Sequence, residues 1–112
     1  MQIKEETAGG VAVVAVAGRL DSNTSPELAR VLATTIAAGH SRLVLDLTGT
    51  QYLSSAGLRV LLQVAKQIEQ SSGRFVLHGL NARVRDVLDI GGFLTELRVC
   101  GDRAEAVADA GA

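Results

Sequence analysis

The sequence predicts one α/β domain, with a mixed, mostly parallel β-sheet of four to five strands and about four α-helices. Short apolar runs alternate with stretches of helical periodicity, and the first two runs are separated only by a turn at Gly9-Gly10. Helical connections imply parallel neighbouring strands, whereas a two-residue turn joins antiparallel ones, so the sheet is expected to be mixed. At 112 residues and 47% hydrophobic, the chain suits one domain with a real core.

The first half of the chain is expected to contain two strands and a helix. The strands are predicted over residues 3–7 and 11–16, with residues 18–21 leaving the sheet. Ser25 is expected to cap the helix, with Pro26 at the first helical position and Glu27 in the first turn. Gly39 is expected to end this helix.

The second half is expected to contain a central strand over residues 43–47, because its apolar residues would lie on both faces of the sheet. A long amphipathic helix follows from Gly57 to about Ser71, and its apolar positions recur three and four residues apart. The remaining predicted elements are a strand over 74–78, a helix capped by Asn81 and ended by Gly91-Gly92, an edge strand over 97–99, a helix over 102–109, and a frayed tail over 108–112.

Composition excludes several classes of function. The formal net charge is -1 and aromatic residues make up 3% of the chain, so neither a basic nucleic-acid surface nor a base-stacking platform is predicted. No signal peptide or membrane-spanning apolar run occurs, so no membrane partner is expected. The single cysteine, Cys100, cannot form an internal disulfide, which suits the reducing cytoplasm.

No arrangement of residues typical of catalysis or of cofactor binding stands out. His40 and His78 have no nucleophile paired with them by a local motif, and both glycine pairs lack the pattern of a phosphate-binding loop. Asp21 and Asp46 both follow apolar strand residues and could hold a metal, but such acids more often cap loops. We therefore expect no enzyme, no cofactor and no metal.

The most informative segment is Y-L-S-S-A-G-L-R, residues 52–59, where an apolar strand gives way to the long helix. Ser54 and Ser55 lie just before the expected first turn. A helix start has unpaired N–H groups and a partial positive charge, which favour a capping hydroxyl and would favour an added phosphate still more. One serine could be only a cap, or this could be a modification site.

Three segments, taken in order, resemble the STAS domain and, within it, the anti-sigma factor antagonists. The segments are G-R-L-D-S-N-T-S-P-E-L (18–28), L-V-L-D-L-T-G-T-Q-Y-L-S-S-A-G-L-R-V-L-L (43–62) and G-R-F-V-L-H-G-L-N-A-R-V-R-D-V-L-D-I-G-G-F (73–93). The middle segment is the specific one, since it is similar to the family's strand, D-S-S-G-L or S-S-A-G-L turn, and helix. The resemblance implies a single STAS domain over residues 1–112, with a core of about 3–107.

The resemblance also implies a phosphorylation site and a partner surface. The serine that a partner kinase phosphorylates in the family matches Ser55, and Ser54 stands where the family usually has aspartate, which makes Ser54 an alternative acceptor. The second hydroxyl of the family's pair matches Ala56. The implied partner surface consists of Asp21, Ser54, Ser55, Ala56, Gly57, Leu58 and Arg59.

The expected function is therefore that of an anti-sigma factor antagonist, a binding module without an active site. In its unphosphorylated form it would bind an anti-sigma factor serine/threonine kinase of the histidine-kinase-like ATPase fold, and so free a sigma factor. Phosphorylation would release the kinase, and a serine phosphatase would be a further partner. The alternative is a STAS domain that senses a ligand or serves as a scaffold in another signalling or transport assembly, without phosphorylation.

Overall fold

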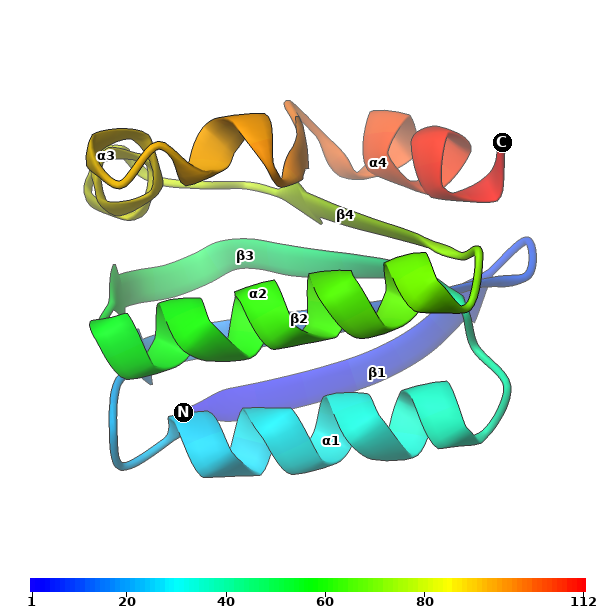
Figure 1. Cartoon of the computed structure of the whole chain (residues 1–112), viewed down its shortest axis with the longest axis horizontal. Coiled ribbons are helices and arrows are strands. Elements are labelled where there is room, and N and C mark those ends of the chain that lie inside the picture. Colours follow the sequence, from blue (N-terminus) through cyan, green and yellow to red (C-terminus); the bar gives the residue numbers. More distant parts are fainter.

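A computed structural model describes all residues, 1–112, and shows a five-stranded sheet with helices on both faces (Figure 1). The strands are β1 (Gln2–Ala8), β2 (Val11–Leu20), β3 (Arg42–Leu53), β4 (Arg74–His78) and β5 (Arg98–Cys100). The helices are α1 (Ser25–Ala37), α2 (Ser55–Gln70), α3 (Ala82–Ile90) and α4 (Arg103–Gly111), with a 3-10 turn η1 (Phe93–Thr95). None of these helices combines the length and the apolar character needed to cross a membrane.

The strands lie in the sheet in the order in which they occur in the chain. β1 pairs with β2 in antiparallel orientation, and β2, β3, β4 and β5 follow one another in parallel. The predicted α/β class with a mixed, mostly parallel sheet and four helices is thus confirmed. Because the parallel strands all point the same way, the turns that leave β2 and β3 meet at one edge of the molecule.

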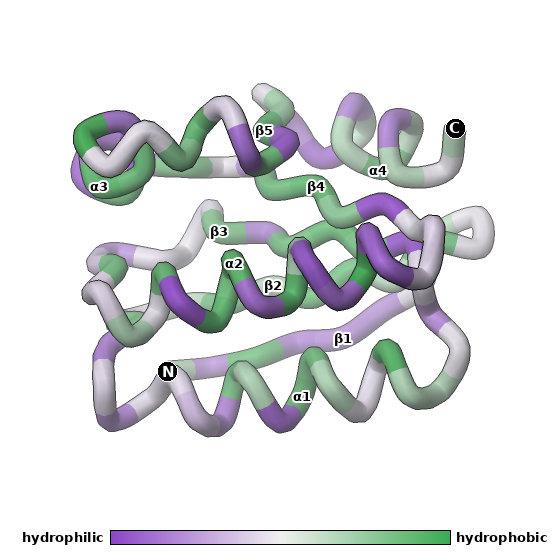
Figure 2. The backbone as a smooth tube through the Cα atoms, viewed as in Figure 1, coloured by the Kyte–Doolittle hydropathy of each residue, from purple (hydrophilic) through white to green (hydrophobic).

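The two faces of the sheet are covered very differently. The front face, covered by α1, α2 and α3, holds a core of 19 buried apolar residues. The back face is covered by α4, and its apolar cluster contains only six buried residues. Alternation along β3 explains the division, since Leu43 and Leu45 belong to the front cluster and Val44 to the back cluster. Figure 2 shows apolar residues concentrated in the central strands, whereas helices such as α2 alternate between apolar and polar residues.

The strand β2 is longer than expected and does not leave the sheet at Gly18. It continues to Leu20, which is fully buried and pairs with Leu53 at the end of β3. The pairing shifts register between Gly18 and Arg19, and Gly18 has a positive φ of 106°. Such an irregularity bends a strand without ending it, and the burial of Leu20 continues the pairing beyond it.

The helix starts also differ from the prediction by one or two residues. α1 begins at Ser25 itself, with Thr24 in the capping position, and α2 begins at Ser55 rather than at Gly57. A helix start can lie ahead of the first periodic apolar residue, because its first turn is defined by backbone geometry rather than by burial. The shift in α2 changes the roles of the two serines, as described below.

The C-terminal residues are ordered rather than frayed. α4 continues to Gly111, and Ala110 is fully buried in the back cluster. The guanidinium of Arg42 donates to the backbone oxygens of Ala110 and Ala112, at 2.8 Å each. A cation suits the negative end of a helix, and this contact joins residues too far apart in sequence for a local pattern to reveal it.

Candidate functional site

The candidate site lies where β2 and β3 end side by side. Leu20 and Leu53 are paired across the sheet, and the N–H of Ser54 donates to the Leu20 oxygen at 2.9 Å. Asp21 and Ser54 each directly follow one member of that pair. The structure therefore brings the Gly18–Leu28 and Leu43–Leu62 segments together at one edge of the sheet, as the expected site requires.

The two serines at the start of α2 have different roles. Ser54 is the N-cap: it is half-buried, and its Oγ accepts a hydrogen bond from the N–H of Gly57 at 3.3 Å. Ser55 is the first helical residue, is exposed, and its hydroxyl makes no hydrogen bond within the protein. The capping role thus belongs to Ser54, which leaves the Ser55 hydroxyl accessible to an incoming group.

Gly57 lets α2 approach the end of β2 closely. It is buried, and a Cβ atom at this position would lie 2.7 Å from Leu53 Cδ1 and 2.9 Å from the backbone oxygen of Leu20. Real side chains do not tolerate such distances, so any larger residue would push the helix away from the strand. The glycine of the S-S-A-G turn is therefore required by packing, and it keeps Ser55 close to the β2–α1 loop.

Asp21 is held within its own loop. Its Oδ1 accepts hydrogen bonds from the backbone N–H groups of Asn23 (3.0 Å) and Thr24 (3.2 Å) and from the Thr24 hydroxyl (3.2 Å). Desolvation raises the pKa of Asp21, but these hydrogen bonds and the nearby Arg19 outweigh it and lower the pKa below the usual value. The carboxylate is therefore negatively charged at neutral pH and shapes the loop between β2 and α1.

The other residues of the expected partner surface form the first turns of α2. Ala56 and Leu58 are half-buried, and Leu58 packs against the front core. Arg59 is exposed, lies one turn after Ser55, and has no ion-pair partner. Ser55 and Arg59 therefore lie one turn apart on α2, and both side chains are exposed.

Sequence reasoning missed a stacked pair at the same edge. The guanidinium carbon of Arg19 lies 4.3 Å from the centre of the Tyr52 ring, and the two residues are partners across β2 and β3. A hollow of about 330 Å³ adjoins the ring and is lined by Tyr52, Leu53, Arg83, Asp86 and Val87. In the sequence, Arg19 and Tyr52 each stand one residue before the paired leucines that end the strands, which is the signal that could have revealed them.

Asp46 does not lie at this site. It was expected to end a strand beside Asp21, but β3 continues for seven residues beyond it, to Leu53. Asp46 is buried, and its carboxylate accepts hydrogen bonds from the Thr48 N–H (2.9 Å) and from Arg103 Nη2 of α4 (2.8 Å). The two aspartates therefore cannot form the metal site that their sequence positions had left open.

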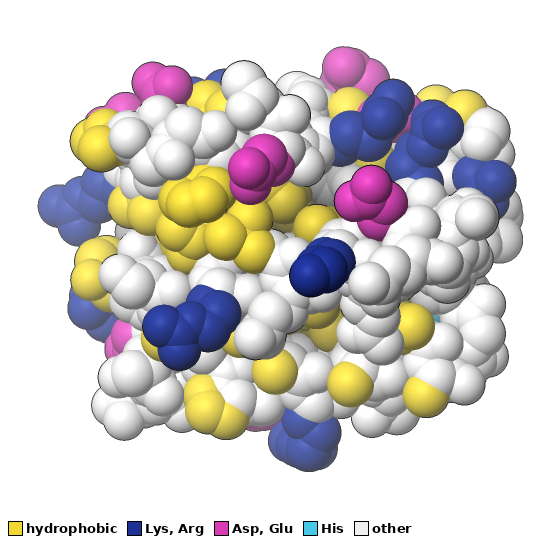
Figure 3. Space-filling view, viewed as in Figure 1, with side chains coloured by type: hydrophobic (Ala, Val, Ile, Leu, Met, Phe, Trp, Pro, Cys, Tyr) yellow, Lys and Arg dark blue, Asp and Glu magenta, His cyan; other side chains and the backbone are white.

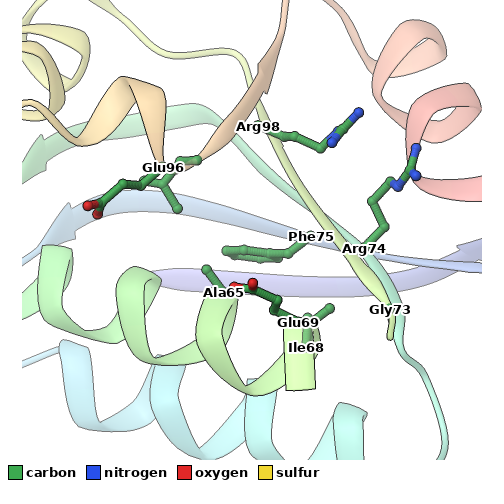
Figure 4. A pocket seen from close by; sticks show the side chains of 9 residues that line it. Ala65, Ile68, Glu69, Gly73, Arg74, Phe75, Glu96 and Arg98 are labelled. Carbon is green, nitrogen blue, oxygen red and sulfur yellow. The ribbon is translucent and has the colours of Figure 1, made fainter. Parts of the chain in front are cut away.

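A second hollow, of about 260 Å³, lies at the opposite end of α2 (Figure 4). Phe75 and Ala65 line its apolar part, and Arg74 and Arg98 lie toward α4. Both arginines form ion pairs with Asp109, at 3.2 and 3.0 Å. These arginines thus bind α4 to the sheet, and this hollow is separate from the Ser55 site.

Comparison with known proteins gives a consistent result. The STAS domain family model matches residues 2–106. BtrV of Bordetella bronchiseptica, provisionally assigned as an anti-sigma factor antagonist, is 39% identical over 108 residues, which cover 96% of this chain and 93% of BtrV.

Solved structures show the same fold. The crystal structure of an anti-sigma factor antagonist from Mycobacterium paratuberculosis has a TM-score of 0.89 at 24% identity, covering 97% of this chain and 92% of that one. The Bacillus cell fate determinant SpoIIAA in its phosphorylated form has a TM-score of 0.75 at 18% identity, covering 96% and 98%.

The family match extends over almost the whole chain, and the similarity to BtrV covers nearly all of both proteins. The family is non-enzymatic, in agreement with the expectation from the sequence. This chain is a STAS domain protein of the anti-sigma factor antagonist family.

Proposed function

We propose that the unmodified protein binds an anti-sigma factor serine kinase in the cytoplasm and thereby frees a sigma factor, and that phosphorylation of Ser55 ends the binding. The observation that carries this proposal is the exposed, unbonded Ser55 hydroxyl at the first residue of α2, next to the Asp21 loop. A kinase can reach this hydroxyl without unfolding the domain. A related fold, SpoIIAA, has been solved in a phosphorylated form.

The charge change at Ser55 supplies the switch. A phosphate adds roughly 1.5 to 2 negative charges at neutral pH. At the start of a helix this charge is favoured by the helix dipole, so the domain itself tolerates it. The effect therefore falls on the partner, which loses its fit to the serine and meets a new charge. Each ~1.4 kcal/mol lost in this way weakens binding about tenfold.

The serine in place of the usual aspartate does not remove the acceptor. Ser54 is half-buried and its oxygen is occupied by the Gly57 N–H, so it is the poorer target of the two serines. The Asp21 carboxylate, which is held nearby by its loop, supplies a negative charge at this edge. A serine phosphatase would restore the binding form.

Phosphate transfer tests the proposal directly. Incubation with ATP and a purified anti-sigma factor kinase of the histidine-kinase-like ATPase fold, taken from the same organism, should add one phosphate, measured as intact mass. Ser55→Ala should abolish the addition, and Ser54→Ala should retain it. A phosphate mapped to Ser54 or to Thr50 would contradict the assignment of the acceptor. No transfer and no complex would favour the scaffolding alternative.

Calorimetry against the same kinase tests the consequence. Ser55→Asp, which carries one negative charge and mimics a phosphate incompletely, should weaken binding without unfolding the domain. Asp21→Asn should weaken it as well, and it is preferable to alanine because the amide oxygen can still accept hydrogen bonds from Asn23 and Thr24. Equal affinities for the wild type and both variants would place the interface elsewhere.

A further inference from the structure

We propose that the Arg19–Tyr52 stack and the hollow beside it form an anchor for the anti-sigma factor, in which Arg19 takes a carboxylate and the hollow an adjoining apolar side chain. The inference rests on the proposed function and extends its surface beyond the turn at Ser55. Sequence reasoning had limited that surface to Asp21 and residues 54–59. The stack lies at the same sheet edge but belongs to the strands.

The guanidinium of Arg19 is held in place, but part of its hydrogen-bonding capacity is not used within the protein. Its face lies over the Tyr52 ring at 4.3 Å, and its Nε is 3.6 Å from Asp21 Oδ2. Neither Nη atom has a hydrogen-bond partner in the protein, and the side chain is 60% exposed. Two free, parallel N–H groups on a planar, fixed guanidinium match a carboxylate in bidentate geometry. The stack therefore favours an acidic side chain of the partner.

The hollow offers an apolar surface next to this cation. Tyr52, Leu53 and Val87 supply its apolar lining, and Arg83 and Asp86 of α3 stand at the same opening. Leu53, which also lines the hollow, directly precedes Ser54, so the hollow adjoins the strand that leads into the Ser55 turn. On α3, Ile90 follows Val87 by three residues and is 88% exposed, the only large apolar side chain so exposed. The apolar surface thus extends along one side of α3.

The arginines at this edge support an acidic partner, although Asp21 and Asp86 lie there as well. Arg19, Arg59 and Arg83 come from three different elements, and neither Arg59 nor Arg83 has an ion-pair partner. Figure 3 shows Lys and Arg side chains at the end of the molecule where α2 and α3 begin, and a second group at the opposite end near α4. The chain as a whole has a net charge of -1, so the arginines at this end do not reflect a general basic excess.

Fixed aromatic and arginine side chains are the groups that contribute most at interfaces. Tyrosine and arginine are enriched among the few residues that carry most of the binding free energy of an interface. An arginine already held by a ring and a carboxylate also loses little freedom on binding. If the stack only stabilised the fold, its removal would lower stability and leave the affinity of the folded protein unchanged.

The test is calorimetry of the unphosphorylated protein against the same purified kinase anti-sigma factor. Arg19→Ala and Tyr52→Leu should each weaken binding by roughly tenfold or more. Tyr52→Phe, which keeps the ring face, should lose less than Tyr52→Leu. Arg19→Glu should lose more than Arg19→Ala, because it would repel a carboxylate. Arg30→Ala, an exposed arginine on α1 without an ion pair, is the matched control and should bind like the wild type.

Thermal melts of each variant alone separate binding from folding. Affinities of Arg19→Ala and Tyr52→Leu within about twofold of wild type, with Ser55→Asp still weakened, would overturn the anchor and leave the proposed function standing. An Arg19→Glu variant that binds as well as Arg19→Ala would contradict the proposal that Arg19 binds a carboxylate of the partner. A wild-type protein that does not bind the kinase at all contradicts both proposals.

Discussion

The front and back faces of the sheet are stabilised by different kinds of interaction. On the front face, α1, α2 and the strands contribute leucines and valines that are almost completely buried, such as Leu28, Leu45 and Leu61. On the back face, α4 contributes only Ala106 and Ala110 to the buried cluster. Charged side chains hold this helix in place, with Arg103 at its start bound to Asp46 and Glu6.

The polar character of the back face continues beneath α4. Asp46 is paired with His78 across β3 and β4, and His78 Nε2 lies 3.5 Å from Asp46 Oδ1. This nitrogen is the only buried side-chain polar atom without a hydrogen-bond partner. The comparison teaches that the front face provides most of the hydrophobic stability, while the back face depends on ion pairs that acid, salt and single substitutions can weaken.

The largest loss of stability is expected on the front face. Leu61→Ala removes a fully buried side chain from α2 and should lower the free energy of unfolding by about 2–5 kcal/mol, through lost burial and the cavity left behind. Urea melts followed by circular dichroism measure this. Gln63→Ala, an exposed position on the same helix, is the control and should change it by no more than about 0.5 kcal/mol. Equal small losses at both positions would mean that the buried side of α2 is wrongly placed.

An intermediate loss of stability is expected when the ion pair between Arg103 at the start of α4 and Asp46 is removed. Arg103→Met keeps the length of the side chain but leaves the buried Asp46 without its cation, which should cost about 1–3 kcal/mol. Faster amide exchange confined to α4 should accompany the loss in urea melts. Arg85→Met on α3, where the arginine is exposed and unpaired, should stay within about 0.5 kcal/mol of wild type. Identical results for the two variants would show that the back face does not rely on this ion pair.

A smaller difference separates the two serines at the start of α2. Ser54→Ala removes the cap of the Gly57 N–H and should cost about 0.5–2 kcal/mol. Ser55→Ala removes an exposed, unbonded hydroxyl and should change stability by no more than about 0.5 kcal/mol. Chemical denaturation of both variants checks the order. A larger loss at Ser55 than at Ser54 would contradict the cap assignment.

The smallest effect concerns pH. The Arg98 and Arg74 guanidinium groups lower the pKa of Asp109 despite its partial burial, so ionised Asp109 stabilises the fold. A carboxyl with a lowered folded-state pKa contributes fully above its unfolded pKa of about 4 and loses its contribution as pH falls through the folded-state value. Asp109→Asn should therefore lower stability slightly, by roughly 1 kcal/mol or less, at neutral pH.

Urea melts of the Asp109→Asn variant and of wild type at a series of pH values measure this dependence. The difference between the two proteins should shrink below about pH 4, because a protonated Asp109 resembles the asparagine. A difference that stays constant from neutral to strongly acidic pH would show that the Asp109 ion pairs do not stabilise α4.

Much of the fold could be predicted because it depends on local patterns. Apolar runs of strand length, helical periodicity around Leu61 and the turn at Gly9-Gly10 act over a few residues, and they identified every strand and helix. The limits of the elements were less certain. The continuation of β2 to Leu20 depends on pairing with Leu53, and the last turn of α4 depends on Arg42, so both required contacts between distant segments.

The candidate site, like the fold, has features that follow from local sequence and features that depend on contacts between distant segments. The sequence by itself determined the turn with Ser54 and Ser55, because a hydroxyl before a glycine and an amphipathic helix is a local signal. Only the tertiary structure decided which serine caps the helix, that the Asp21 carboxylate accepts hydrogen bonds from its own loop, and that the Arg19 guanidinium stacks on the Tyr52 ring. These contacts depend on the register of β2 against β3, which is set by the burial of both strands together and by no property of either strand alone.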